Sequence, residues 1–107
     1  MFQLRIYTLR SADALRRYAD VHWARHLTTF AVFGITTHGV WTEHDADAHR
    51  LIAVIQYPPG SDPDEATRRV VASPEFAADM AGFDVSDIVA VETTLLDPTS
   101  TTSSPIR

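Results

Sequence analysis

The chain has 107 residues, a formal net charge of −5 and no cysteine. This length predicts a single domain with a modest hydrophobic core. The nine basic residues are all arginine and are scattered along the chain, whereas a nucleic-acid-binding surface needs clustered positive charge. The absence of lysine excludes Schiff-base chemistry, and the absence of cysteine excludes thiol catalysis, disulfides and thiolate metal sites.

The N-terminal residues lack the basic and apolar regions of a signal peptide. No later segment has the run of about 20 apolar residues that a membrane-spanning helix needs. We therefore expect a cytoplasmic protein whose partners include neither membranes nor nucleic acids.

The first third of the chain predicts a strand followed by a long helix. Apolar and polar residues alternate over 2–9, which is the period of a strand with two different faces. The helix is expected over 11–33, with Ser11 or Asp13 as its N-terminal cap. Gly34 stands where a helix typically ends.

The rest of the domain predicts a β-hairpin, two helices and a last strand. β-Branched and aromatic residues indicate strands over 35–43 and 51–57, separated by an acidic loop that contains histidines. Helices are expected over 64–72 and 73–80, the second with a serine cap followed by proline. The last strand is expected over 88–96.

This order of elements, βαββαβ, is that of a ferredoxin-like α+β sandwich with an antiparallel sheet and the helices on one face. Residues 1–97 form the domain, and residues 98–107, rich in serine, threonine and proline, form a tail with nothing to bury. The strands over 51–57 and 88–96 are apolar on both faces, so the second face of the sheet needs a cover. A homodimer that packs sheet against sheet provides it.

Two histidines, His22 and His26, lie one turn apart on the predicted buried face of the first helix. They fall within a stripe of apolar residues, namely Leu15, Ala19, Phe30 and Phe33. Buried imidazoles need hydrogen-bond partners, because an unpaired buried polar group costs about 1–3 kcal/mol. The pair therefore indicates either a polar cavity in the core or two core histidines satisfied by backbone or strand groups.

Three segments resemble those of NIPSNAP-type proteins. Residues 34–43, Gly-Ile-Thr-Thr-His-Gly-Val-Trp-Thr-Glu, resemble the Gly-Ile-x-x-x-Gly-Phe-Trp-Thr stretch of that family. Residues 73–76, Ser-Pro-Glu-Phe, resemble its Asp-Pro-Glu-Trp motif, and residues 2–9 resemble its first strand, Glu-Leu-Arg-Thr-Tyr. The resemblance covers residues 2–97, and His26 corresponds to the family's helix histidine.

The resemblance implies a dimeric α/β barrel. This superfamily also contains small polyketide cyclases, cofactor-free monooxygenases, muconolactone-type isomerases and EthD-like proteins. Such relatives bind their ligand between the sheet and the helices of one subunit, which is where His22 and His26 would point.

A zinc site is one use of two histidines on one helical face. The third ligand would come from His38, Glu43 or Glu92, but the glutamate that follows the first histidine in zincins is here Trp23. The histidines of the loop 44–49 are expected to be solvated. With only two well-placed ligands, we expect no metal and no other cofactor.

Proton transfer is the chemistry that the histidine pair favours. Imidazole titrates near physiological pH, and two adjacent imidazoles are not easily protonated together, so one stays available as a base. We assign His26 as the leading catalytic base and His22 as its partner. Arg25 either stabilises a developing enolate or carboxylate, or is a solvated arginine on the helix flank.

Substrate contacts are expected from Tyr7, Arg25, Trp41 and His38. Tyr7 shares one face of its strand with Gln3 and Arg5. If that face meets the helix, all three are pocket residues, and otherwise they belong to an interface. Trp41 is either a pocket wall or a core residue.

The sequence thus favours a small cofactor-independent enzyme that acts on a lipophilic or aromatic, polyketide-like molecule. Its reaction would be a cyclisation, dehydration or isomerisation by proton transfer. The alternative is a non-catalytic NIPSNAP-type ligand-binding or interaction protein in which both histidines are structural. The expected partners are a small molecule and a second copy of the chain.

Overall fold

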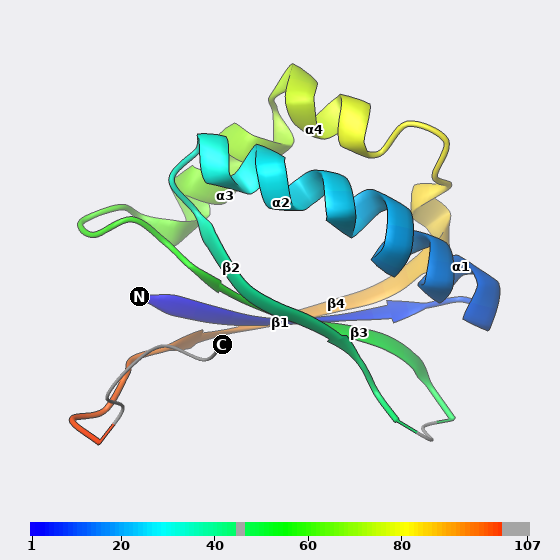
Figure 1. Cartoon of the computed structure of the whole chain (residues 1–107), viewed down its shortest axis with the longest axis horizontal. Coiled ribbons are helices and arrows are strands. Elements are labelled where there is room, and N and C mark those ends of the chain that lie inside the picture. The colour runs from blue at the N-terminus through cyan, green and yellow to red at the C-terminus, as the bar shows by residue number, and fades with distance from the viewer. Residues whose placement is uncertain (45–46, 102–107) are drawn as a thin grey trace.

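A four-stranded antiparallel sheet forms one layer of the structure, and the helices cover one of its faces (Figure 1). The computed structural model describes residues 1–44 and 47–101. Its elements are β1 (Phe2–Leu9), α1 (Ala12–Arg17), η1 (Tyr18–His22), α2 (Trp23–Val32), β2 (Thr36–Thr42), β3 (His49–Gln56), α3 (Pro63–Val71), α4 (Pro74–Asp79), η2 (Val85–Asp87) and β4 (Ile88–Leu96). The predicted ferredoxin-like α+β fold is confirmed.

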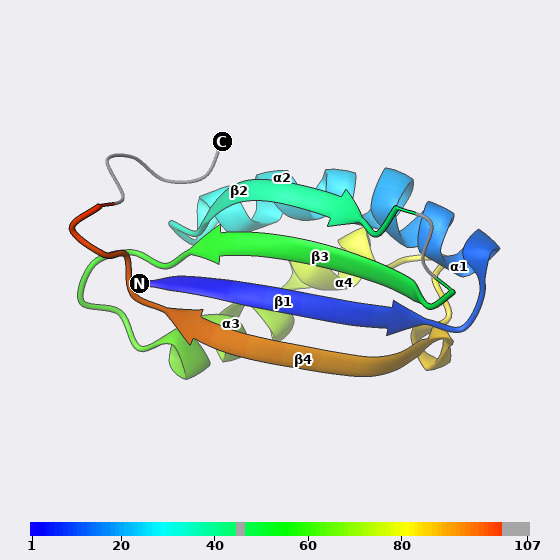
Figure 2. The same ribbon diagram turned by 90° about the horizontal axis from the view of Figure 1, so that it is seen from below.

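The strands follow the order β2-β3-β1-β4 across the sheet, and all neighbours are antiparallel. Figure 2 shows the sheet from the side that no helix covers. The first and last strands of the chain therefore lie side by side, with β4 at one edge. No helix of the described residues is long and apolar enough to cross a membrane.

The polar side chains of β1 point toward the helices, which answers the question that the alternation left open. Gln3, Tyr7 and Leu9 are buried. Tyr7 pairs across the sheet with Leu51 of β3, which is fully buried. Directly paired residues of antiparallel strands share a face, so the face that carries Gln3, Arg5 and Tyr7 lies under the helices.

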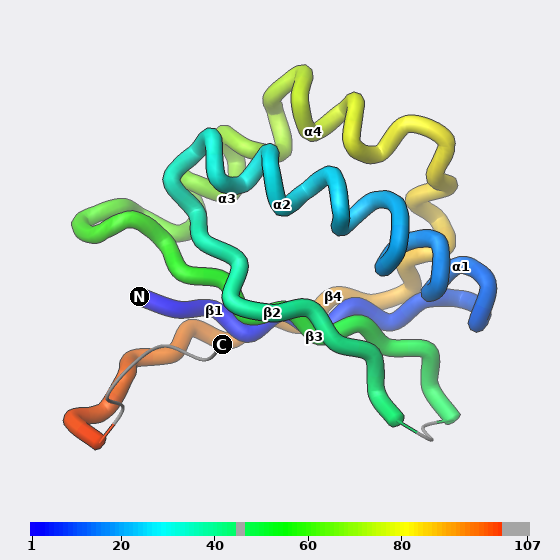
Figure 3. Tube along the Cα trace, viewed as in Figure 1, coloured from blue at the N-terminus to red at the C-terminus, as the bar shows by residue number. Residues whose placement is uncertain are grey.

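The long predicted helix spans three segments that run on without a break from α1 through η1 to α2 (Figure 3). Ser11 is its N-terminal cap, and its side chain accepts a hydrogen bond from the amide of Ala14. At the other end Gly34 has a φ of 78°, and the amide of Ile35 donates to the carbonyl of Phe30. This is the left-handed helix end that glycine favours.

The middle segment η1 is a π-helix, which the sequence pattern did not predict. Its turns are wider than those of an α-helix and shift the buried face. Leu15 and Ala19 of the predicted stripe are only partly buried, whereas Tyr18 and Trp23 lie in the core. His22 and His26 are buried, as the stripe predicted.

Two short helices, α3 and α4, connect β3 to β4. Each begins at a side-chain cap followed by proline: Asp62 accepts a hydrogen bond from the amide of Asp64, and Ser73 accepts one from the amide of Phe76. The tail residues 102–107 and residues 45–46 of the acidic loop lie outside the described residues.

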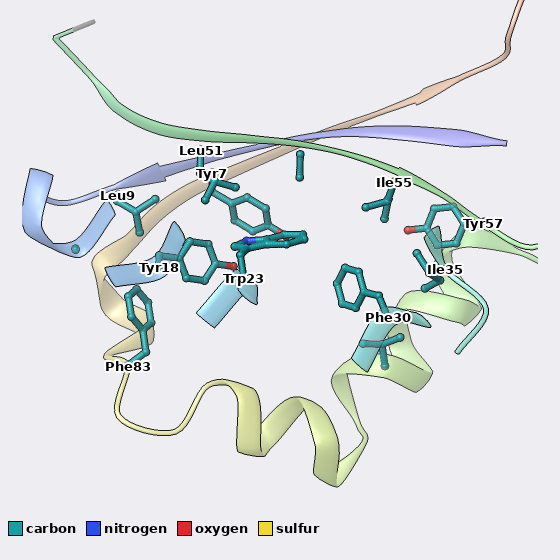
Figure 4. Close-up of a cluster of buried hydrophobic side chains, with 13 residues drawn as sticks. Tyr7, Leu9, Tyr18, Trp23, Phe30, Ile35, Leu51, Ile55, Tyr57 and Phe83 are labelled. Atoms are coloured by element: carbon teal, nitrogen blue, oxygen red, sulfur yellow. The ribbon is translucent and has the colours of Figure 1, made fainter. Parts of the chain in front are cut away.

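The core lies between the sheet and the first helix, with Trp23 near its centre (Figure 4). Trp23 is 1% exposed and meets Tyr7, Tyr18 and Phe30 through edge-to-face ring contacts. Figure 4 shows Leu9, Tyr18 and Phe83 at one end of the cluster and Phe30, Ile35, Ile55 and Tyr57 at the other.

The end of α2 gives a test of this geometry. We expect Gly34→Ala to destabilise the chain more than Gly60→Ala, although both glycines have a positive φ, 78° and 76°. An alanine in this conformation costs about 1 kcal/mol at either position. At position 34 a Cβ would also lie 3.0 Å from Cγ of Pro58, whereas nothing lies within 4 Å at position 60. Urea unfolding measures both changes, and equal losses would contradict the placement of Pro58.

Candidate functional site

Both predicted catalytic histidines bind the same residue, Asp79 at the C-terminal end of α4. Nδ1 of His26 donates to Oδ2 of Asp79 over 2.9 Å. Nδ1 of His22 lies 2.8 Å from the backbone carbonyl of Asp79 and donates to it. All three residues are buried, with at most 7% of each exposed.

Arg25 belongs to the same contact. Its Nη1 atom donates to the carbonyl of Asp79 over 3.1 Å and to that of Ala81 over 3.3 Å. The last carbonyls of a helix have no partner within it, so His22 and Arg25 satisfy groups that α4 leaves open. The contact therefore fastens the end of α4 to α2.

The His26 ring is 1% exposed and lies between two aromatic rings. Phe30 stacks on it at 5.4 Å and Phe76 at 5.0 Å, both nearly parallel. Burial lowers the pKa of His26 and outweighs the opposing effect of the Asp79 carboxylate. His26 is therefore a neutral imidazole at physiological pH, with its proton on Nδ1.

A cavity of about 240 Å³ lies between the helices and the sheet. Its lining residues are mostly apolar: Arg5, Tyr7, Tyr18, His26, Phe30, Ile35, Ile55, Tyr57, Thr67, Val70, Val71, Phe76, Met80, Val85 and Ile88. Val71 and Val85 are more than half exposed, 54% and 64%, and lie where the cavity meets solvent. Burial raises the pKa of Tyr18, so its hydroxyl stays neutral.

A polar cluster lies at the β1 wall of this cavity. Arg5 donates from Nε to Oε1 of Gln3 over 2.6 Å, from Nη1 to the Tyr7 hydroxyl over 2.9 Å, and from Nη2 to Oγ1 of Thr67 over 3.3 Å. The Tyr57 hydroxyl donates to Oε1 of Gln3 over 3.0 Å and lies 2.8 Å from Oγ1 of Thr67. None of the four residues around Arg5 in this cluster, Gln3, Tyr7, Tyr57 and Thr67, is a carboxylate.

The structure brings His26 and Tyr7 to one cavity and places the other predicted contacts elsewhere. His22 and Arg25 do not line this cavity. His38 and Trp41 lie on the uncovered face of the sheet: Nε2 of His38 is 2.9 Å from Oε1 of Gln56, and Trp41 is 42% exposed. A β-bulge between Thr37 and Gly39 shifts the alternation of β2, so both side chains point away from the helices although they stand three positions apart.

The described residues contain no group of three or more His, Cys, Asp or Glu side chains arranged to hold a metal ion. The candidate third ligand His38 is separated from His22 and His26 by the sheet. The Asp79 carboxylate, which does contact His26, is the acceptor of its Nδ1 proton.

Sequence reasoning missed Asp79, Thr67 and Tyr57. Asp79 lies 53 positions after His26, and nothing in a six-residue helix predicts which of its ends meets α2. Thr67 and Tyr57 lie in segments whose relation to β1 depends on how α3 packs. Only the alternation of β1, which aligned Gln3, Arg5 and Tyr7, carried a signal for this cluster.

Comparison with known proteins assigns the family. The NIPSNAP family model matches residues 2–103. This chain belongs to the NIPSNAP family. No curated protein matches it.

Solved NIPSNAP structures share the fold across nearly the whole chain. A NIPSNAP-like domain protein from Burkholderia xenovorans is 18% identical, covers 99% of this chain and 90% of its own, and superimposes with a TM-score of 0.77. A NIPSNAP family protein of unknown function from Agrobacterium tumefaciens is 17% identical, covers 99% of this chain and 92% of its own, and gives 0.73. A second NIPSNAP family protein from Agrobacterium tumefaciens is 19% identical, covers 99% of this chain and 97% of its own, and superimposes with a TM-score of 0.70.

The expected polyketide-type enzyme with histidine-mediated proton transfer is wrong. The match is to the NIPSNAP family along nearly the whole chain, and a solved member is described as having unknown function. No enzymatic activity is supported by these relatives. The findings favour the non-catalytic alternative, and the bonds of His22 and His26 to Asp79 give both rings a structural task.

The lowered pKa of His26 predicts a pH-dependent stability of this NIPSNAP domain. As the pH falls below about 6.5, His26 becomes protonated in the unfolded chain. In the folded chain it becomes protonated only at a lower pH, because its pKa is lowered. The free energy of unfolding should therefore decrease over this interval. In His26→Asn, which keeps an N–H donor for Asp79 and does not titrate, the decrease should be smaller.

Urea unfolding of parent and variant between about pH 8 and pH 5 measures the difference. Leu27→Ala, on the half-exposed side of α2, keeps every histidine and should retain the parent's pH dependence. An unchanged pH dependence in His26→Asn would contradict the buried neutral ring.

Proposed function

We propose that this protein is a non-catalytic ligand-binding protein whose cavity takes a small, largely apolar molecule. The observation that carries the proposal is the cavity of about 240 Å³ between sheet and helices, which is much larger than a single water molecule needs. Binding sites for small molecules are concave, mostly apolar and equipped with a few polar groups. Arg5, Tyr7 and His26 are such groups here.

The surroundings of the histidines support a binding role. Nδ1 of His26 holds Asp79, and two phenylalanine rings fix the imidazole plane. His22 donates a hydrogen bond to the backbone carbonyl of Asp79 and does not line the cavity. In this proposal both histidines keep α4 in position, and His26 and Tyr7 contact the ligand. A cytoplasmic location stays a prediction.

Octan-1-ol is a suitable neutral probe for the cavity. We expect calorimetric titration to detect its binding to the parent chain, because its hydrocarbon part replaces water against apolar walls. Val70→Phe, which adds a ring at a buried wall position, should abolish binding. Val32→Phe, at a position of α2 that is 68% exposed, should leave binding unchanged.

Equal binding by the parent and a folded Val70→Phe variant would place the probe outside the cavity. Absence of binding by every apolar probe of this size, charged or neutral, would contradict the ligand-binding function itself.

We also propose that the protein forms a homodimer through the uncovered face of the sheet. Ile52 pairs with Ile6 on one side and with Trp41 on the other, which gives this face an apolar centre. Leu96 of the edge strand β4 pairs with Phe2, lies on the same face and is 37% exposed. A second copy would cover both, and the resemblance to dimeric α/β barrels supports this partner.

Light scattering should give twice the chain mass. A stable interface of this kind should bury at least about 1,200 Å² in total. We expect Ile52→Arg to yield monomers, because it places a charge in the middle of the contact. Val32→Arg introduces the same charge on the outer side of α2 and should remain dimeric. A folded parent that is monomeric at high concentration would contradict the dimer.

A further inference from the structure

Arg5 forms no ion pair with a carboxylate within residues 1–44 and 47–101, and it differs from Arg25 and Arg69, which also form none there, in being half-buried. Among the described residues, ion pairs with carboxylates are formed by Arg10, Arg16, Arg17, Arg50 and Arg68. Arg5 is half-buried, whereas Arg10, Arg16, Arg17 and Arg68 are exposed, and its side-chain hydrogen bonds are to Gln3, Tyr7 and Thr67. Asp64 and Arg68 of α3 line a surface depression next to the cavity, and Arg5 also lines it. Arg68 forms its ion pair with Glu65.

An arginine stays charged at every physiological pH, and the burial of a charge without a countercharge is costly. The neutral oxygens around Arg5 satisfy three of its donors without neutralising it. A guanidinium has five N–H donors, so two are left for another acceptor. Within the described part of the chain, the guanidinium therefore has no countercharge, and two of its N–H groups have no protein acceptor.

The three bonds also hold the guanidinium in place. Gln3 and Tyr7 flank Arg5 on the same face of β1, and Thr67 approaches from α3. The Tyr57 hydroxyl links Gln3 to Thr67 and braces the group. A cation fixed in advance at a cavity wall loses little conformational freedom when an anion binds.

We propose that the cavity binds an apolar monocarboxylic acid, with the carboxylate on Arg5 and the hydrocarbon part among the apolar walls formed by Phe30, Ile55, Val70, Met80 and Ile88. This inference rests on the proposed ligand-binding function and specifies the class of ligand. The planar guanidinium fork matches a carboxylate, and its bonds to a charged oxygen are stronger than those to neutral ones. One cation lining an otherwise neutral cavity balances a single negative charge, which favours a carboxylate over a phosphate dianion.

Octanoate and octan-1-ol test the inference on the unchanged protein, because they share a hydrocarbon chain and differ in the charged end. We expect the affinity for octanoate to be at least about tenfold higher than the affinity for octan-1-ol at neutral pH. Octylamine, with the opposite charge, should bind more weakly than either, and inorganic phosphate should not compete with octanoate.

Variants then separate a ligand contact from a structural arginine. Arg5→Gln should lower octanoate affinity by about tenfold or more and leave octan-1-ol affinity unchanged. Its melting temperature without ligand should be equal to or above that of the parent, because an uncompensated charge has been removed. Arg16→Gln, an equal change of charge at an exposed position, should leave both affinities unchanged.

The outcomes distinguish this inference from the proposed function. If octanoate and octan-1-ol bind equally well and Arg5→Gln changes neither, the cavity binds ligands but Arg5 doesn't recognise carboxylates. If neither compound binds, the ligand-binding function fails. If Arg5→Gln does not fold, the comparison of the two compounds on the parent still decides the matter.

Discussion

The attachment of α4 to α2 through Asp79 is the contact on which the cavity depends. A helix of six residues is not stable by itself, so α4 takes its position from what it touches. His22 and Arg25 hold its terminal carbonyls, and His26 holds the Asp79 side chain. Because Phe76 and Met80 form part of the cavity wall, the same contact sets the distance between α4 and the sheet.

The π-helix η1 lies directly before the residues of α2 that make this attachment, and His22 is its last residue. It allows Tyr18, His22, Trp23 and His26 to face the interior within little more than two turns. The wider turns of the π-helix bring these positions onto a narrower arc than a regular α-helix would. The residues of this segment thus supply the aromatic centre of the core and the polar bonds to α4 together.

The two faces of the sheet carry different tasks. Under the helices, β1 contributes Gln3, Arg5 and Tyr7 to a braced polar cluster that faces an apolar cavity. The other face presents apolar side chains with no helix over them, and β4 is exposed along its length. In the functions proposed here, the first face binds a ligand and the second meets another copy of the chain.

The sequence by itself determined the elements, their order and the family, because alternation, helical periodicity, caps and glycine positions are local properties that each segment carries on its own. It also determined that His22 and His26 are buried. It could not identify Asp79 as their partner, place His38 and Trp41 on the opposite face, or show that Arg5 lies in a cavity without a carboxylate. Those features arise where segments far apart in the chain meet, and only the register of β2 in the sheet and the packing of α3 and α4 over it decided which groups meet there.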